Sequence, residues 1–192
     1  MITKDITMRN AASVWDFVRI FFLYHKAFPR EEKKPFSRII SKWRAGQTDA
    51  WMFFKGGRFA GFAFTLNGSD LIMLDYLAVS KRMQRQGIGT AALMRLLEVY
   101  RGKRFFLEIE SEYEDGPDRQ SRRDRKRFYM QCGLKPLNVM ADVYGVKMEL
   151  MGLNMRMDFN EYLAFYRDTY RPVSVNYIKK LPYPCEEVGY SV

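Results

Sequence analysis

A basic, glycine-containing loop follows the most apolar strand that the sequence predicts, at residues 71–79. The loop has three cations and a pair of glycines where the next helix begins: Lys81, Arg82, Arg85, Gly87 and Gly89. The first turn of a helix has unpaired main-chain amides and the positive end of the helix dipole, so it binds phosphate readily. Because glycine lacks a Cβ, a bulky diphosphate can approach the main chain closely. The pattern therefore predicts an anion-binding loop.

Two better-known phosphate loops do not fit this segment. A Walker A loop would need a Lys-Ser or Lys-Thr pair after the glycines, and none follows. A dinucleotide fingerprint would need a third glycine where Ala92 stands, within a parallel βαβ unit that opens the chain.

One carboxylate, Asp75, interrupts the apolar strand. Burial disfavours the charged form of a carboxylic acid, so we expect a raised pKa that suits a general base. A structural carboxylate paired with an arginine or a tyrosine hydroxyl is the alternative, and the sequence leaves both open.

The amino-acid composition is that of a single ordinary folded domain. Of 192 residues, 47% are hydrophobic and 28% are charged, and 32 Lys and Arg against 22 Asp and Glu give a net charge of +10. Two cysteines, Cys132 and Cys185, and the single His25 make neither a disulfide framework nor a metal site. No apolar run has the roughly 20 residues of a membrane span, and the N-terminus lacks a signal-peptide core, so we expect a cytoplasmic protein with no membrane partner. The positive charge favours anionic ligands.

The periodicity of apolar residues predicts one mixed α/β sheet with helices on its faces. Expected helices cover residues 12–27, 35–45, 87–100, 119–132 and 158–170. Expected strands cover residues 50–55, 58–66, 71–79, 104–110, 134–140 and 144–151, with a hairpin turn at Gly56-Gly57.

Two segments resemble the GNAT superfamily of N-acetyltransferases. Leu77-Ala78-Val79 followed by Gln84-Arg85-Gln86-Gly87-Ile88-Gly89 is similar to the family's acyl-CoA motif, Q/R-x-x-G-x-G/A after a central strand. Residues 105–110, then Arg123, then Arg127-Phe128-Tyr129 and Gly133-Leu134, resemble the following strand and helix end. The resemblance covers about residues 10–151 and implies a single GNAT domain over residues 1–151 with splayed central strands. Residues 152–192, a helix and a tail, are expected to pack on the same domain.

The resemblance implies acetyl-CoA as co-substrate, and no metal. The main chain of the central strand, Leu77, Ala78 and Val79, would hold pantetheine. The loop would hold the pyrophosphate through the amides of Arg85, Gly87, Gly89 and Thr90, and Gln84, Gln86 and Ile88 complete it.

The implied reaction is direct attack of a primary amine on the thioester in a ternary complex. A lysine-like ammonium, with a reference pKa near 10.4, must lose a proton first. Candidate bases are Asp75 and, on the face of one strand, Glu108 and Glu110, acting directly or through water. The family motif implies that Tyr129 lies beside the sulfur and protonates the leaving thiolate.

Two charged runs leave alternatives open. Six acidic residues between Glu108 and Asp118 form either a solvated loop or a funnel for a cationic small-molecule or peptide acceptor. Six of the nine residues from Arg119 to Arg127 are basic. Such a run suits a helix face exposed to solvent, contact with the adenosine phosphate of the cofactor, or binding of nucleic acid. The competing functions are therefore a basic nucleic-acid-binding domain, which explains the loop less well, and a CoA-binding module without turnover. The sequence leaves the acceptor and the choice between monomer and homodimer undecided.

Overall fold

The structure is a computed structural model that describes residues 6–30, 32–170 and 175–184. Its contacts divide the chain into two compact units, Met1–Leu107 and Glu108–Val192, and each is described by itself. Cys185 and Pro172 lie outside the described residues. Within the described residues, no helix has the length and apolar character of a membrane span.

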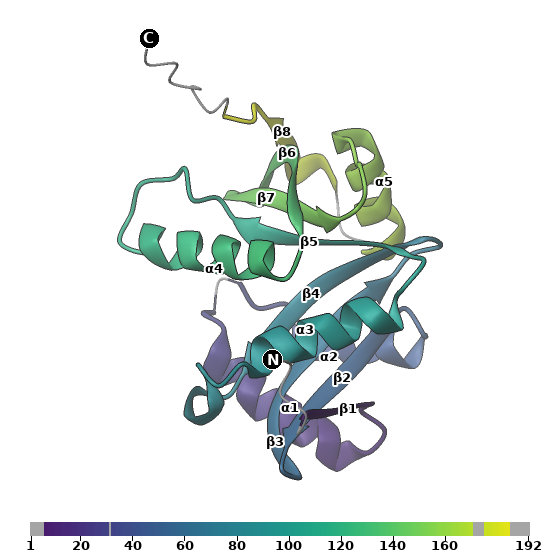
Figure 1. Ribbon diagram of the computed structural model, residues 1–192. Helices are drawn as coiled ribbons and strands as arrows, with labels where there is room; N and C mark the ends of the chain where they lie inside the picture. Colours follow the sequence, from purple (N-terminus) through teal and green to yellow (C-terminus); the bar gives the residue numbers. More distant parts are fainter. Residues whose placement is uncertain (1–5, 31, 171–174, 185–192) are drawn as a thin grey trace. The chain divides into compact units, whose positions relative to one another are not determined.

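The first unit is a mixed sheet with helices on both faces (Figure 1). Its elements are β1 (Ile6–Asn10), α1 (Val14–Ala27), α2 (Phe36–Arg44), β2 (Thr48–Lys55), β3 (Arg58–Asn67), β4 (Leu71–Val79), the short 3₁₀ helix η1 (Lys81–Met83), α3 (Ile88–Val99) and the first residues of β5 (Arg104–Glu110). The strand order is β1-β2-β3-β4-β5. The pairs β1–β2, β2–β3 and β3–β4 are antiparallel, whereas β4 and β5 are parallel. The mixed α/β class that the sequence predicts is therefore confirmed.

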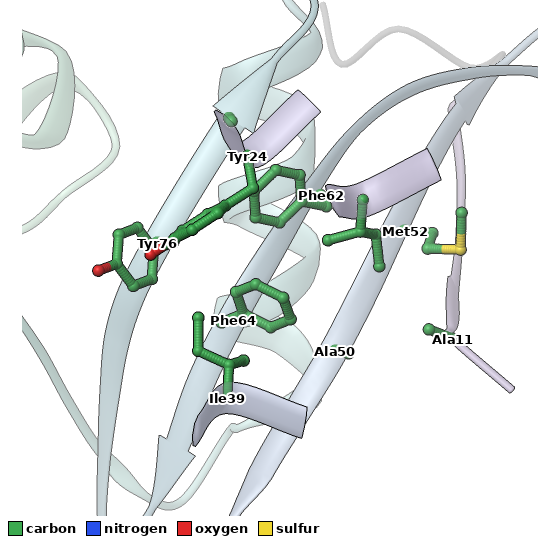
Figure 2. Close-up of a cluster of buried hydrophobic side chains, with 10 residues drawn as sticks. Ala11, Tyr24, Ile39, Ala50, Met52, Phe62, Phe64 and Tyr76 are labelled. Carbon is green, nitrogen blue, oxygen red and sulfur yellow. The ribbon is translucent and has the colours of Figure 1, made fainter. Parts of the chain in front are cut away.

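Aromatic side chains fill the side of this sheet that α1 and α2 cover. Figure 2 shows Tyr24 of α1 beside Phe62 and Phe64 of β3 and Tyr76 of β4. On the other side, α3 contributes Ile88 and Ala91 to a smaller cluster. Because both faces are covered, β4 is buried over most of its length, as its continuous apolar run predicts.

A bulge distinguishes β4 from its neighbours. Phe64 pairs with Tyr76 and Thr65 pairs with Leu74, which leaves Asp75 as the extra residue of a β-bulge. Pairing with β3 continues beyond the bulge to Val79, and within the first unit β4 pairs in parallel with β5 from Leu71 opposite Arg104 to Leu74 opposite Leu107.

Three glycines explain how β3 meets its neighbours. Gly56 and Gly57 both have positive φ, +54° and +74°, as the predicted two-residue hairpin requires. Gly61 lies where β3 approaches β4, and a Cβ there would meet the Ala78 carbonyl oxygen at 2.2 Å. The close approach of the two strands therefore depends on glycine at this position.

The second unit contains the end of β5, then α4 (Arg119–Gln131), β6 (Lys135–Val143), β7 (Val146–Leu153), α5 (Phe159–Thr169), the 3₁₀ helix η2 (Val175–Tyr177) and β8 (Ile178–Leu181). β6 pairs antiparallel with β7 on one side and with β8 on the other. Cys132 caps α4 and is buried.

Two short strands were not predicted. β1 has five residues and only Ile6 is buried, and β8 has four residues and only Ile178 is buried. Strands this short have too little alternation to be recognised, and they are stabilised by pairing with β2 and β6, which are distant in sequence. The expected helices and the remaining strands agree with the structure to within a few residues.

A buried carboxylate joins β1 to the start of α1. Asp16 accepts hydrogen bonds from both terminal nitrogens of Arg9, at 2.7 and 2.8 Å, and from the amides of Ala12 and Ser13. Ser13 in turn accepts from the Asp16 amide, which completes a capping box. The Arg9 guanidinium is the main cause that holds the pKa of Asp16 well below its usual range.

We predict that Asp16→Asn lowers the free energy of unfolding by about 2 kcal/mol at pH 7, because it removes charged hydrogen bonds at a helix start. Urea unfolding measures the loss. The depressed pKa means that the wild-type carboxylate stabilises the fold above about pH 4 and ceases to do so as pH falls, so the two proteins should converge in acid. Glu98→Gln, which affects an exposed ion pair with Arg101, serves as the control. A control loss equal to that of Asp16→Asn would contradict this account.

Candidate functional site

The loop from Gln84 to Thr90 has the main-chain geometry of an anion site. Arg85 and Gly87 both have left-handed conformations, with φ of +59° and +73°, and Gly87 caps α3 without any side-chain hydrogen bond. Ala91 is the first residue whose amide bonds back, to the Gly87 carbonyl at 3.0 Å. Within the described residues, the amides of 85–90 donate to no other main-chain group. Such alternating conformations at a helix start direct several amides at one ligand.

Two glutamine side chains brace this loop. Gln84 Nε2 donates to the Val79 carbonyl at 3.0 Å, which ties the loop to the end of β4. Gln86 Nε2 donates to the Arg82 carbonyl at 3.1 Å and its Oε1 accepts from Lys55 at 2.8 Å. The side chains of this pair therefore tie the loop to β4, to the preceding 3₁₀ helix and to Lys55 of β2. The left-handed Arg85 is a feature that the sequence did not predict.

The strand before the loop presents different surroundings on its two sides. Ala78 is buried in the aromatic cluster, and Leu77 and Val79 are half-buried. Val79 packs against the cluster that contains Ile88 of α3. Both half-buried residues pair with β3, Leu77 opposite Ala63 and Val79 opposite Gly61.

Asp75 is held in an ion pair. Its Oδ1 lies 2.6 Å from Lys34 Nζ, and its side chain is 9% exposed. The sequence suggested an arginine or a tyrosine as a structural partner, and the structure adds a lysine 41 residues away in the chain. No local sequence signal connects Lys34 to β4.

The remaining predicted catalytic residues lie in the second unit. Tyr129 is half-buried in the last turns of α4, and its ring contacts Phe128. Burial raises the pKa of Tyr129 to about 12, although Arg125 acts in the opposite direction. The side chain is therefore a neutral phenol, able to donate a proton, across the physiological range.

Glu108 and Glu110 are both half-buried on β5, alternating with buried Ile109, as the predicted strand requires. Glu108 accepts a hydrogen bond from the Tyr162 hydroxyl at 2.5 Å and from the Tyr166 hydroxyl at 3.3 Å. Burial is the main cause that raises the pKa of Tyr162 well above its ordinary value, and the charge of Glu108 raises it further. Both tyrosines come from α5, a helix for which sequence analysis assigned no role at the site.

Acidic and basic runs of the second unit pair with one another. Asp115 pairs with Arg119, Glu114 with Lys147, and Glu112 with both Arg123 and Lys126; the N···O distances run from 2.7 to 3.4 Å. Much of the charge that suggested a cationic funnel, or a nucleic-acid surface, is therefore compensated within the unit.

A separate open groove of about 1240 Å³ lies beside α4. Its lining is Glu112, Arg123, Lys126, Arg127, Met130, Lys135, Pro136, Asn138, Tyr183 and Pro184. None of the predicted site residues is among them.

Comparison with known proteins supports the motif. The sequence profile of the acetyltransferase (GNAT) family matches residues 17–133, well over half of the chain. This chain belongs to the GNAT family. No curated protein matches it at a significant level.

Solved structures show the GNAT fold for this chain. A GNAT-family protein from Bacteroides thetaiotaomicron is 18% identical with a TM-score of 0.71, covering 85% of this chain and 96% of that one. The ribosomal-protein-S18-alanine N-acetyltransferase of Escherichia coli is 20% identical with a TM-score of 0.59, covering 80% and 96%. An acetyltransferase from Bacillus subtilis, solved in complex with CoA, is 13% identical with a TM-score of 0.57, covering 78% and 99%.

The second unit of this GNAT protein contains a buried lysine, Lys126, that pairs with two carboxylates. Lys126 Nζ lies 2.8 Å from Glu112 and 3.0 Å from Glu149, and the Tyr183 hydroxyl also donates to Glu149. Glu149 is fully buried. Burial acts to lower the pKa of Lys126, but the two carboxylates outweigh it and raise the pKa above its ordinary value.

We predict that Lys126→Met lowers the free energy of unfolding by about 3 kcal/mol or more at pH 7, because Glu149 is left buried without its cation. Urea unfolding gives the value, and adding Glu149→Gln should restore part of it. Arg127→Met, at an exposed pair with Asp124, should cost no more than about 1 kcal/mol. Equal losses for the two single variants would argue against a buried ion-pair network.

Proposed function

We propose that this protein is an N-acetyltransferase that moves the acetyl group of acetyl-CoA to a primary amine by direct attack in a ternary complex. The observation that carries the proposal is the loop after β4, where Arg85 and Gly87 have left-handed conformations and, among the described residues, the amides of 85–90 donate to no main-chain group. A diphosphate suits these amides, and Gly87 places no Cβ in its way.

Residues of the first unit would bind the co-substrate. The amides of Arg85, Gly87, Gly89 and Thr90 hold the diphosphate, and Lys81 and Arg82 add attraction that salt weakens. The main chain of Leu77 and Val79, after the bulge in β4, pairs with the pantetheine amides. An amide near Val79 polarises the thioester carbonyl.

The reaction needs one proton acceptor and one proton donor. Asp75, Glu108 or Glu110, directly or through water, takes a proton from the amine, whose nitrogen forms a bond to the carbonyl carbon. The carbon–sulfur bond then breaks, and the Tyr129 hydroxyl gives its proton to the departing thiolate. No covalent bond to the protein forms, so neither cysteine is required.

Gly87→Val should abolish CoA binding, because a branched side chain occupies the space of the diphosphate. Isothermal titration calorimetry measures CoA binding by each protein, and the wild-type protein should release heat. Valine at positive φ also strains the main chain, so Gly102→Val is the matched control: it lies just after α3 with φ of +86° and open space around it. Wild-type affinity in Gly87→Val, or no heat from folded wild-type protein at millimolar CoA, would refute the loop assignment.

Tyr129→Phe should lower kcat about a hundredfold or more while CoA affinity stays within about twofold, because only the proton donor is lost. Thiol release in the presence of an amine panel gives the rate. Because the pKa of Tyr129 is about 12, its hydroxyl stays protonated between about pH 7 and 10, and its ionisation should not lower the rate in this range. Tyr177→Phe, at an exposed ring, is the control. An unchanged kcat would remove Tyr129 from the mechanism, and CoA binding without any thiol release would indicate a non-catalytic module.

A further inference from the structure

The helix α1 carries large apolar side chains on its outer side as well as on the side that packs against the sheet. Val14 is 79% exposed, Trp15 is 73% exposed and Phe22 is 69% exposed. Ile20 and Tyr24, on the opposite side of the helix, are buried in the aromatic cluster. A helix that is apolar all round is normally covered all round. The described part of the chain covers only one side of α1.

The exposed residues form one continuous stripe along α1, called here the outer stripe: Val14, Trp15, Val18 and Phe22. Val14, Val18 and Phe22 are each four residues apart, so they lie in one row along the helix. Trp15 and Phe22 are seven residues apart, which is two turns, so their rings share the same side. Single exposed apolar residues are common on protein surfaces, whereas a continuous stripe marks a docking surface.

Two exposed cations border the outer stripe. Arg19 follows Trp15 by four residues, and Lys26 follows Phe22 by four residues, so each cation lies beside a ring. The only acid in the sequence of α1 is Asp16, which is buried in the capping box. An occupant of the outer stripe must therefore accept aromatic rings and positive charges at the same place.

The sequence around α1 is positive when every acid is counted. Residues 9–34 contain six Lys and Arg against three Asp and Glu. Lys33 Nζ donates to the His25 carbonyl at 3.3 Å, which brings a further cation to the C-terminal end of α1. The two remaining acids, Glu31 and Glu32, follow the helix, and Glu31 lies outside the described residues. The charge of this segment therefore complements an anionic surface.

We propose that the outer stripe docks α1 onto a membrane surface that contains anionic phospholipid. Trp15, Phe22 and the two valines enter the boundary between headgroups and acyl chains, and Arg19 and Lys26 contact lipid phosphates. A bilayer surface suits the convex side of a helix, because it requires no groove of matching shape. We expected no membrane partner because the sequence lacks a spanning segment, and docking on the surface does not require one.

Charge argues against a second copy of this chain as the occupant. In a two-fold dimer the same surface meets itself, so Arg19 and Lys26 of both copies would come together with no carboxylate of α1 between them. An anionic bilayer neutralises the same cations. The inference does not depend on acetyl transfer.

Sedimentation with lipid vesicles tests the docking. We expect the full chain to sediment with vesicles of phosphatidylcholine that contain about 30% phosphatidylserine and to stay in solution with pure phosphatidylcholine. Added salt should weaken the binding. Among the three tryptophans, Trp15 is the exposed one, whereas Trp43 is half-buried and Trp51 is buried. Tryptophan emission should therefore shift to shorter wavelength on binding, and Trp15→Phe should remove most of the shift while binding remains.

Apolar variants test the stripe itself. Trp15→Ser combined with Phe22→Ser should raise the apparent dissociation constant for the phosphatidylserine vesicles about tenfold or more, because less apolar area enters the interface. Tyr177→Ser combined with Val99→Ser is the matched control, since both side chains are exposed apolar groups elsewhere. It should change the constant by less than about twofold. Circular dichroism checks that each variant folds.

Charge variants test the two cations. Arg19→Gln combined with Lys26→Gln should also raise the constant about tenfold or more, because each cation near an anionic surface adds to the attraction. Arg44→Gln combined with Arg95→Gln makes the same change in net charge at exposed positions of α2 and α3. This control should have an effect of less than about threefold.

Three results would overturn the inference. The first is that folded wild-type protein does not sediment with the phosphatidylserine vesicles. The second is that stripe variants and their controls lose the same affinity, which would indicate general attraction by the net charge of +10. The third is a wild-type dimer that binds no vesicles and becomes a monomer in Trp15→Ser with Phe22→Ser, as measured by light scattering, which would identify a second copy as the occupant.

Discussion

The bulge at Asp75 shifts the register of β4 against β3, and the proposed chemistry depends on the stretch of β4 that follows it. The main chain of Leu77 and Val79, which the proposal assigns to pantetheine, lies in this stretch. Tyr76 and Ala78 of the same stretch fill the aromatic core. One local irregularity therefore changes the register of the strand while its aromatic side stays anchored.

The stability of that irregularity comes from the packing around it. Gly61 lets β3 approach the Ala78 carbonyl, and Lys34 neutralises the carboxylate that the bulge places against the core. Tyr24 and Tyr76 tie the segment of Lys34 to the same cluster. An uncompensated buried carboxylate would be costly, so the ion pair is a condition for having Asp75 in this strand at all.

Charge is distributed differently in the two units. In the second, three of the six acids between Glu108 and Asp118 (Glu112, Glu114 and Asp115) pair with bases of α4 and β7, and Lys126 joins Glu112 to the buried Glu149. In the first, Lys81, Arg82 and Arg85 lie in the segment before α3. The net charge of +10 is thus consistent with an anionic co-substrate.

Local signals in the sequence were sufficient for most elements and for the loop. Apolar periodicity identified β2 to β7 and the helices α1 to α5, Gly56-Gly57 identified a hairpin, and Gln84 to Gly89 identified the motif of the family. These features depend on neighbouring residues, which is why they can be read along the chain. The strands β1 and β8 could not be predicted in this way, because a partner distant in sequence stabilises each of them.

The chemistry of single side chains was decided only by tertiary structure. Sequence singled out Asp75 and Glu108 as carboxylates on apolar strands, but not that Lys34 would pair with one and Tyr162 would hydrogen-bond to the other. The partners come from segments 41 and 54 residues away. Burial and partners set the charge state of a carboxylate, and both arise only when the chain folds, so residue type and spacing predicted where the groups lie but not what surrounds them.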